Sequence, residues 1–402
     1  MSDMLSIDAA LERLMTSARP LAETETLPAE AVLGRILAQD LVSQVNVPPL
    51  DNAAMDGYAL RLADWSADAW LPVSQRIPAG SLPQPLAAGS AARIFTGAPI
   101  PPGADTVVMQ EDTETRAEGE NSLVRIARSP KLGSHVRRTG EDIRDGQTVL
   151  SPGVRLGPAQ LGVAASVGAT GLKVFRRLKV AVFFTGDEII MPGQALPPGR
   201  IYNSNRATLL ALLGRLGLEV LDLGQVPDKL EATVAVLERA SKEADVVITT
   251  GGVSVGEEDH VKSAVERLGR LDMWKVAMKP GKPLAYGRVG EADFVGLPGN
   301  PVSAYVVYTL FVRPFLLARM GALPAPPMAF TVPANFAWPK PGKRREFLRA
   351  RLEDGQAVLY PNQGSGVLTS LAWADGLVDV PDGVTVQPGD SVRFLPLGEW
   401  LA

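Results

Sequence analysis

The stretch DVVITTGGVSVGEEDHVK, at positions 245–262, contains the pattern on which the fold prediction depends. A short β-branched run comes first, and two glycines, Gly251 and Gly252, follow it directly. Glycines placed after a strand allow the backbone to approach a phosphate, but the three acids at 257–259 would repel a bare phosphate. The stretch therefore predicts a strand followed by a loop, and two roles are open for that loop. Either it does not bind phosphate, or a cation lies between the loop and a phosphate ligand.

Strand-like and helix-like patterns alternate on both sides of this stretch, from residue 178 to the proline-rich run ALPAPP at 322–327. Such alternation predicts βαβ units and a mainly parallel sheet. The predicted strands lie at residues 179–184, 219–226, 245–250, 273–278 and 293–297, with helices after Asn203, after Asp228, near Asp259 and from Val302. We place the end of this α/β domain near Ala325.

The rest of the chain has a different pattern. Before residue 178 it is rich in glycine and proline, with short β-like runs such as TVVM at 106–109. After residue 326, short β-like segments predict a small β-barrel or sheet. A chain of 402 residues is too long for one compact core. The predicted fold class is therefore an α/β multidomain protein.

The composition excludes several kinds of chemistry. Cysteine is absent, which rules out disulfides, iron–sulfur clusters, thiolate zinc sites and a cysteine nucleophile. The only histidines are His135 and His260. A metal, if one takes part, is expected to be a hard cation such as Mg²⁺ held by carboxylates. The net charge of −4 and the lack of a basic stripe argue against nucleic acid as a partner.

The sequence gives no prediction of export or of a membrane span. The N-terminal residues include early acids and no basic region ahead of an apolar run. The most apolar late segment, AYVVYTLFVRPFLLARM at 304–320, is interrupted by Arg313 and Pro314 and is short for a span. We expect a cytoplasmic protein with no membrane partner.

Polar loops follow four of the predicted strands directly. Because the carboxyl ends of parallel strands share one edge of a sheet, side chains in these loops are expected to converge there. They are Asp187, Glu188, Asp228, Asp259 and Asn300. Three lysines, Lys275, Lys279 and Lys282, come from the same half of the domain. Carboxylates that hold a divalent cation, with lysines that meet phosphates, would suit a polyanionic ligand.

Structural roles are alternatives for several of these residues. Asp228 and Glu231 have the spacing of a capping box, Asp259 occupies a plausible N-cap, and Asn300 precedes a proline as an N-cap does. The lysines could form a solvated face. Glu257 stands where a Walker A loop has its lysine, so that the glycine-rich loop is not a Walker A site.

Two stretches in the first half of the chain are also candidates for ligand binding. PPLDNAAMDGYAL at 48–60 places two aspartates among small residues, and HVRRTGEDI at 135–143 places two arginines beside two acids. Arginine can hold a phosphate or a planar acidic ring, and the acids can accept hydrogen bonds from a heterocycle. The alternative for the second stretch is an exposed turn with weak local ion pairs.

Taken together, these motifs resemble the molybdopterin molybdenumtransferases, the MoeA family, which is related to the E domain of gephyrin. The resemblance spans most of the chain through PPLDNAAMDGYAL, FTGAPIPPGADTVVMQED, RRTGEDI, TGDEI, IYNSNR, TTGGVSVGEEDHVK, MKPGKPLAYG and GLPGNPVSA. Two positions depart from the family pattern: Ala53 stands where a serine is common, and Trp373 where a small or acidic residue is usual.

The resemblance implies an activity and an architecture. The family inserts molybdate into adenylylated molybdopterin to make molybdenum cofactor and releases AMP, with a divalent cation such as Mg²⁺. The implied architecture is an elongated linking domain (1–45 with 147–177), an inserted α+β domain (46–146), a molybdopterin-binding α/β domain (178–325) and a C-terminal β-barrel (326–402). It also implies a homodimer with a shared active cleft and transient contact with the molybdopterin adenylyltransferase.

The resemblance assigns roles to residues at the matching positions. The implied catalytic residues are Asp56, Asp142, Glu188, Asp228 and Asp259, and the implied metal ligands are Asp187, Glu188 and Asp259. The implied substrate-binding residues are Thr96, Arg137, Lys275, Lys279, Pro298, Asn300, Pro301 and Ser303. Two other functions remain as alternatives: an adenylyltransferase that shares the α/β domain and its double-glycine loop, and a non-catalytic binding or scaffold protein.

Overall fold

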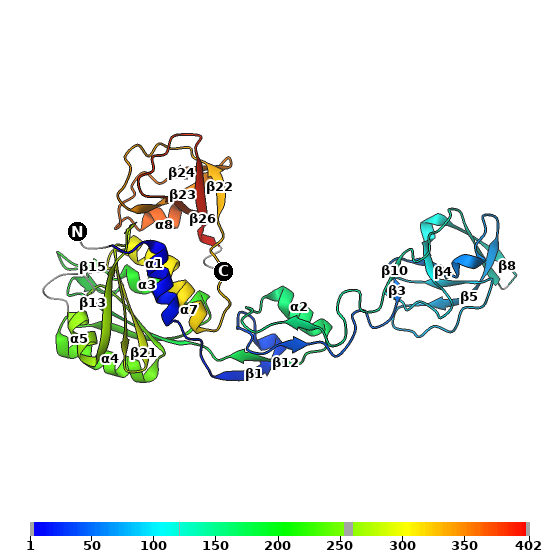
Figure 1. Ribbon diagram of the computed structural model, residues 1–402, viewed down its shortest axis with the longest axis horizontal. Coiled ribbons are helices and arrows are strands. Elements are labelled where there is room, and N and C mark those ends of the chain that lie inside the picture. The colour runs from blue at the N-terminus through cyan, green and yellow to red at the C-terminus, as the bar shows by residue number, and fades with distance from the viewer. Residues whose placement is uncertain (1–3, 120, 253–259, 399–402) are drawn as a thin grey trace.

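The computed structural model describes residues 4–119, 121–252 and 260–398. The molecule is elongated, with an α/β module and a β-rich C-terminal module at one end (Figure 1). A narrow connecting region forms the middle, and a separate β-rich module forms the other end. The molecule therefore has several cores rather than one.

The α/β module is built on a six-stranded sheet. Its strands lie in the order β16 (Glu219–Val226), β13 (Lys179–Thr185), β17 (Val246–Thr250), β21 (Ala292–Leu297), β20 (Pro283–Val289) and β18 (Gly269–Lys275). The first four are parallel, and β20 and β18 add an antiparallel hairpin. The predicted alternation of strands and helices and the predicted mainly parallel sheet are both confirmed.

Helices cover both faces of this sheet because successive side chains of a buried strand point to opposite faces. Val180, Val182 and Phe184 of β13 belong to one core cluster, whereas Ala181 and Phe183 belong to another. The first core is completed by α3 (Ser204–Arg215) and by the continuous helical run of α6 (Pro301–Val307), the π-helical turn η4 (Tyr308–Val312) and α7 (Arg313–Arg319). The second core is completed by α4 (Leu230–Glu243) and α5 (His260–Leu268).

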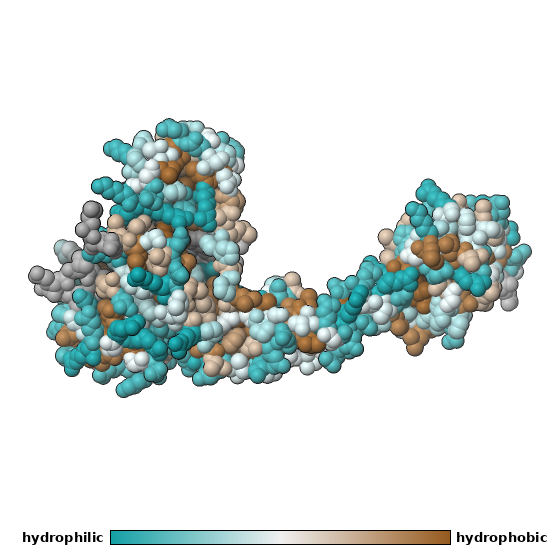
Figure 2. Space-filling view, viewed as in Figure 1, coloured by the Kyte–Doolittle hydropathy of each residue, from teal (hydrophilic) through white to brown (hydrophobic). Residues whose placement is uncertain are grey.

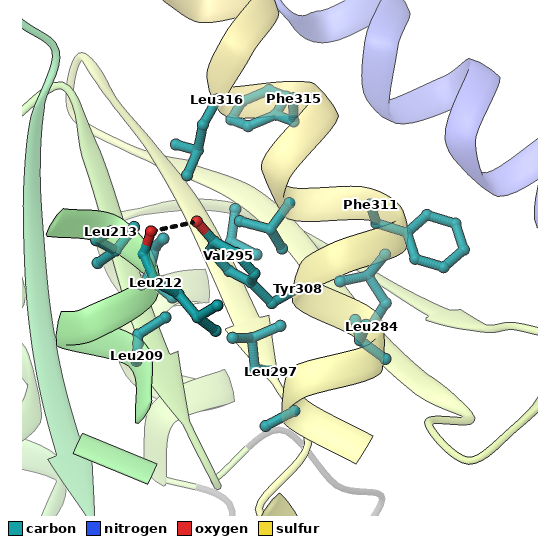
Figure 3. Packing of buried hydrophobic residues seen from close by; sticks show 14 of the residues in the cluster. Leu209, Leu212, Leu213, Leu284, Val295, Leu297, Tyr308, Phe311, Phe315 and Leu316 are labelled. Atoms are coloured by element: carbon teal, nitrogen blue, oxygen red, sulfur yellow. Dashed lines mark hydrogen bonds between the residues drawn. The ribbon is translucent and has the colours of Figure 1, made fainter. Parts of the chain in front are cut away.

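The long helical run packs closely on α3 (Figure 3). Tyr308 is buried between Leu209, Leu213 and Val295, and its hydroxyl donates to the Leu212 carbonyl at 3.3 Å. Within the described part of the chain, the run Pro301–Arg319 is the one helix long and apolar enough to cross a membrane, with a mean hydropathy of 1.4. Its most apolar window is 61% buried in the protein, as in a core helix.

The connecting region is made from two distant segments of the chain. Strand β1 (Thr24–Pro28) pairs antiparallel with β12 (Gly171–Phe175), and β2 (Leu41–Val42) pairs with β11 (Thr148–Leu150). Helix α2 (Pro158–Ser166) packs on these strands through a small core of its own. Helix α1 (Ile7–Ser17) instead joins the core of the α/β module.

The module at the far end is a mixed six-stranded sheet. Its order is β7 (Thr106–Met109), β4 (Gly57–Leu60), β6 (Ala91–Ile94), β5 (Trp70–Ile77), β9 (Asn121–Ile126) and β8 (Thr113–Glu118), and β3 (Asn52–Ala53) pairs separately with β10 (Val136–Arg137). The described residues of 46–146 contain 3₁₀ turns but no α-helix, which differs from the expected α+β character. Proline supplies no backbone donor and interrupts helices, and it is frequent at 72–85 and 98–103.

The C-terminal module is a sheet attached to the α/β module by a shared strand. Its order is β19 (Met278–Lys279), β23 (Arg345–Glu353), β25 (Gly376–Val380), β26 (Ser391–Pro396) and β22 (Phe330–Pro333), with β24 (Gln356–Leu359) on β23. An isolated bridge from Ala334 to Ala357 links the two ends of this sheet. The expected C-terminal barrel stays a prediction. The short helix α8 (Thr369–Trp373) lies between β24 and β25.

Candidate active site

The structure brings the predicted polar loops to one edge of the α/β sheet. Strands β16, β13, β17 and β21 run parallel in neighbouring positions, and Thr185 pairs with Val226 while Thr250 pairs with Leu297. Their carboxyl ends therefore share one edge, where ligands of open α/β sheets bind. The turn of the β18–β20 hairpin lies at the same edge, since β20 runs antiparallel to β21 and begins beside its carboxyl end.

A cavity of about 450 Å³ opens at this edge. Of the predicted substrate-binding residues, Lys279, Pro298, Asn300 and Ser303 line it, whereas Lys275 and Pro301 are not among the described lining residues. The other described lining residues are Gly251, Gly252, Pro280, Gly281, Lys282, Pro283, Gly299, Arg344, Gln363, Gly364 and Ser365. Three of the side chains are cationic and none in the described lining is a carboxylate, so the described wall favours an anion.

The paired glycines of the cavity wall adopt a conformation that other residues rarely take. Gly251 has φ +86° and Gly252 has φ +62°. A Cβ at Gly252 would lie 2.5 Å from Cγ2 of Val261, in the first turn of α5. Glycine is therefore required here by both backbone angle and space.

Asn205 fixes the neighbouring loop. Its Nδ2 donates to the Gly299 carbonyl at 2.7 Å, and Asn203 caps the helix that carries it by accepting from the Arg206 amide at 3.0 Å. The sequence interpretation did not single out Asn205, although the NSN run that caps the helix contains it.

Lys279 lies in an ion pair that the sequence did not predict. Its Nζ is 3.1 Å from Oε2 of Glu346, whose side chain is 8% exposed. The pairing of β19 with β23 brings these residues together, since Lys279 is in register with Glu346. The same pairing brings up Arg344, which donates to the Met278 carbonyl at 3.1 Å.

The C-terminal module supplies a wall of the cavity through Arg344 and the segment Gln363, Gly364 and Ser365. The carbonyl of Ser365 accepts from the Val302 amide at 3.0 Å, which joins this wall to the first turn of α6. These residues were not predicted for the site, because they follow the proline-rich boundary and share no motif with the loops of the sheet. Only strand pairing between the two modules reveals their position.

The carboxylates at this edge lie beside the cavity rather than in its described lining. Asp187 and Glu188 are exposed and follow β13 directly, and a Cβ at Gly186 would lie 2.6 Å from Oε2 of Glu188. Gln225 holds their loop by donating to the Ile189 carbonyl at 2.9 Å. Asp259 lies outside the described residues, as do Glu257 and Glu258.

The capping alternatives can be compared with the helix starts. Helix α4 begins at Leu230 and its N-cap is Lys229, which makes no side-chain capping bond, so the assignment of Asp228 to the N-cap is wrong. Asn300 does occupy the N-cap of α6, followed by Pro301, but its side chain makes no capping hydrogen bond. Its amide is exposed on the cavity wall instead.

The residues predicted in the first half of the chain lie in the module at the opposite end of the molecule (Figure 1). Asp56 accepts two hydrogen bonds from Thr96, from its amide and its hydroxyl, both at 2.7 Å. These bonds, the amide bond first, hold the pKa of Asp56 below its usual value, and Arg93 adds to the effect. Within one chain, these residues do not converge with the cavity.

Arg137 and Asp142 lie nearby in the same module and are exposed. The adjacent Arg138 forms an ion pair with Asp51 at 2.7 Å, and the Thr139 amide also donates to Asp51 at 2.8 Å. These contacts join the two candidate stretches of the first half of the chain. Arg138 is ion-paired, as in the alternative of an exposed turn with ion pairs, but its partner Asp51 is distant in sequence.

Comparison with known families covers most of the chain. Residues 5–168 match the MoeA N-terminal region (domain I and II), 181–318 match a probable molybdopterin binding domain, and 331–397 match the MoeA C-terminal region (domain IV). A protein of Mycobacterium tuberculosis named molybdopterin molybdenumtransferase 2 is 40% identical over 96% of each chain. The chain belongs to the MoeA family.

Other MoeA relatives agree in sequence and in fold. The molybdopterin molybdenumtransferase of Haemophilus influenzae is 42% identical over 79% of this chain and 78% of its own length. A crystal structure of the molybdopterin biosynthesis MoeA protein from Pyrococcus horikoshii OT3 matches with a TM-score of 0.84 and 28% identity, covering 98% of this chain and all of that one (100%). The multidomain α/β arrangement is therefore a MoeA fold.

The Mg²⁺ that the resemblance implies can be compared with the donors present. Among residues 4–119, 121–252 and 260–398, no three acids or histidines lie close enough together to hold a metal ion. Asp187 and Glu188 nevertheless offer two adjacent exposed carboxylates at the sheet edge, and oxygen donors of this kind suit Mg²⁺. The third implied MoeA ligand, Asp259, lies outside the described residues.

Proposed function

We propose that this protein inserts molybdate into adenylylated molybdopterin, releases AMP and so acts in molybdenum cofactor biosynthesis. The observation that carries the proposal is the basic cavity of about 450 Å³ at the carboxyl edge of the sheet. Its size suits a cofactor-sized ligand, and three of the motifs shared with the family, TTGGVSVGEEDHVK, MKPGKPLAYG and GLPGNPVSA, contribute to its wall. Membership of the MoeA family gives the ligand its chemical class.

The cavity residues would bind and orient the two anionic reactants. Lys279, Lys282 and Arg344 neutralise charge on phosphate and molybdate oxygens, which become more negative as the anhydride breaks. The Gly251–Gly252 backbone approaches the ligand closely because it carries no side chains. An oxygen nucleophile, from water or molybdate, bonds to phosphorus as the phosphoanhydride bond breaks and AMP leaves.

The carboxylates would hold the metal beside this anion site. Asp187, Glu188 and Asp259 are the proposed ligands, and bound Mg²⁺ would neutralise charge on the transferring group. Glu188 and Asp228 would also orient the attacking oxygen. In this arrangement the glycine-rich loop would have both functions that its sequence implies, with its glycines next to the phosphate and Asp259 as a ligand of the cation.

A second subunit would complete the site. Four of the implied site residues lie in the module at the opposite end of the molecule from the cavity, so they can reach a cavity only in another copy of the molecule. They are Asp56, Thr96, Arg137 and Asp142. Exposed apolar side chains of the connecting region, including Leu33, Val42 and Val45, offer an apolar surface for such a homodimer (Figure 2). We extend the proposal to a homodimer with a shared cleft.

The substrate chemistry also implies a supplier. Adenylylated molybdopterin is the product of the molybdopterin adenylyltransferase, and we propose transient contact with that enzyme in the cytoplasm. The contact would pass the labile anhydride directly from one site to the next.

The test is a single-turnover reaction of the purified full-length protein with adenylylated molybdopterin, molybdate and Mg²⁺. We expect AMP release together with molybdenum bound to the pterin, and both should fall when Mg²⁺ is removed with a chelator. The absence of AMP release would refute the proposal. ATP consumption with unmodified molybdopterin would instead favour the adenylyltransferase alternative.

A further inference from the structure

The strand that carries the C-terminal wall of the cavity contains a deeply buried arginine. Arg349 is in β23 and is 1% exposed, among the largest side chains to be fully buried in the described structure. It lies directly behind the cavity wall. Its Nη2 donates to the Gly364 carbonyl at 3.2 Å, and its backbone amide donates to Oε1 of Gln363 at 2.8 Å.

All side-chain partners of Arg349 among the described residues are neutral. Nε donates to the Ser370 hydroxyl at 3.0 Å and Nη1 donates to the Phe347 carbonyl at 3.2 Å. Other arginines of the same strand do have carboxylate partners: Arg345 pairs with Asp379 at 2.5 Å and Arg351 with Glu353 at 3.9 Å. Among the described residues, Arg349 forms no ion pair.

This buried charge is costly in the protein alone. Burial lowers the pKa of Arg349 to about 10, so the guanidinium is still protonated at neutral pH. A buried charge without a partner destabilises the fold unless another charge compensates it. The neighbouring cavity has Lys279, Lys282 and Arg344 on its described wall and no carboxylate there. The nearly buried Glu346 of the same strand pairs with Lys279 and not with Arg349. An anion in the cavity is therefore the compensating charge that Arg349 lacks.

We propose that Arg349 is a positioning residue for anion recognition: it holds the Gln363–Gly364 wall in place and supplies a buried positive charge that a polyanion in the cavity compensates. The proposal deepens the proposed function, since the polyanion would be the phosphoanhydride substrate. Arg349 acts through the wall and does not touch the ligand. Its low-dielectric surroundings strengthen its field at the cavity compared with that of a solvated lysine.

The test compares two substitutions in the full-length protein, with inorganic pyrophosphate as the probe. Arg349→Met removes the charge but keeps an unbranched side chain of similar length, a kind of change that buried ionic sites often tolerate. Arg349→Lys keeps the charge but loses the planar fork. Titration calorimetry gives the pyrophosphate affinity, and circular dichroism with thermal unfolding verifies the fold. If Arg349→Met does not fold, Arg349→Gln replaces it as the neutral variant.

We expect the neutral variant to bind pyrophosphate about tenfold more weakly than the wild type, and the lysine variant to retain most of the affinity. The loss should be smaller for orthophosphate, which carries less charge. A purely structural role would weaken both anions by the same factor. Equal binding by neutral variant and wild type, equal losses in the neutral and lysine variants, or no pyrophosphate binding by the wild type would each overturn the proposal.

These outcomes are separable from those of the proposed function. Charge-dependent pyrophosphate binding without AMP release would refute molybdate insertion while leaving the role of Arg349 intact. AMP release, together with a pyrophosphate affinity that does not change on substitution of Arg349, would support molybdate insertion and refute the role of Arg349.

Discussion

The backbone amide and the side-chain hydroxyl of Thr96 both donate hydrogen bonds to one carboxylate oxygen, Oδ1 of Asp56. The pKa of Asp56 is lowered by these bonds, so the carboxylate stays ionised down to a lower pH than an unassisted aspartate. In Thr96→Val the amide bond remains but the hydroxyl bond is lost, and the pKa should rise. Because activity that needs the ionised form is lost as pH falls through that pKa, the acid limb of the AMP-release profile should move to higher pH.

Thr96→Ser is the matched control, since it keeps the hydroxyl and should keep the wild-type profile. An acid limb that does not move in the valine variant would remove Asp56 from the groups that control activity.

Single residues of the site were predictable where a loop follows a strand directly. Lys279 and Asn300, which the sequence placed near this edge of the sheet, line the cavity, as does Ser303, which only the resemblance implied. Their role in substrate binding stays a prediction. Arg344 and Gln363 were not predictable, because they face the cavity only through the pairing of β19 with β23. The assignment of Asp228 to an N-cap was wrong because the helix begins one residue later than its sequence signal implied.

At the scale of elements, the KPGKP turn between β18 and β20 depends on Gly281. This glycine has φ +100°, and a Cβ there would lie 2.5 Å from Cγ2 of Val307 in α6. Gly281→Ala should therefore lower the free energy of unfolding through backbone strain and, in addition, through overpacking worth about 1–3 kcal/mol. It should also weaken anion binding, because the turn carries two cavity lysines.

Gly193→Ala is the matched control. Gly193 has a similar φ of +96°, but a Cβ there meets nothing within 4 Å. Denaturant unfolding of both variants separates the two contributions. Equal losses in the two variants would show that the contact with Val307 does not matter.

Elements were predictable from the sequence where periodicity and turn signals agreed. All five predicted strands of the α/β domain are present, and β16 has the predicted limits of 219–226. Strand β18 begins at Gly269, earlier than predicted, because it pairs along its whole length with β20. The boundaries of the four-part domain division remain a prediction.

At the scale of the whole molecule, a half-buried ion pair joins the connecting region to the α/β module. Arg176 follows β12 and donates to both oxygens of Asp245, at 2.7 and 2.8 Å. Burial alone would raise the pKa of Asp245, but the bonds from Arg176 and the Lys179 amide outweigh it, and the pKa is lowered. This pair contributes its full stability above the pKa of an aspartate in the unfolded chain, about 3.9. That stability is lost as the pH falls through the lower pKa of Asp245 in the folded protein.

Asp245→Asn should cost about 1–3 kcal/mol at pH 7 and flatten the loss of stability below about pH 4. Thermal unfolding between pH 7 and pH 3 measures both effects. The control is Glu219→Gln, which removes the exposed partner of Lys179 at 3.3 Å and should change little. An asparagine variant with the wild-type acid profile would contradict the assignment.

The proposed shared cleft makes a further prediction for the assembled molecule. Asp56→Ala and Lys279→Ala should each be inactive alone. When the two variants are co-expressed, half of the dimers are mixed and each mixed dimer has one intact cleft, so about a quarter of the wild-type activity should return.

Asp56→Ala co-expressed with Arg137→Ala is the control, because both changes lie in the same module and every cleft would contain one of them. Activity restored to the same level in this control, or none restored in the first pair, would refute the shared cleft. Light scattering gives the mass of the assembly, which should be twice 42.7 kDa.

The pairing of β1 with β12 also has a consequence during synthesis. Strand β1 emerges from the ribosome roughly 150 residues before its partner, a delay of about 7–30 s at common elongation rates. The β-rich module between them contains all strands of its own sheet and can fold in that interval. The β-rich module should therefore fold before the strands β1 and β12 that flank it can pair.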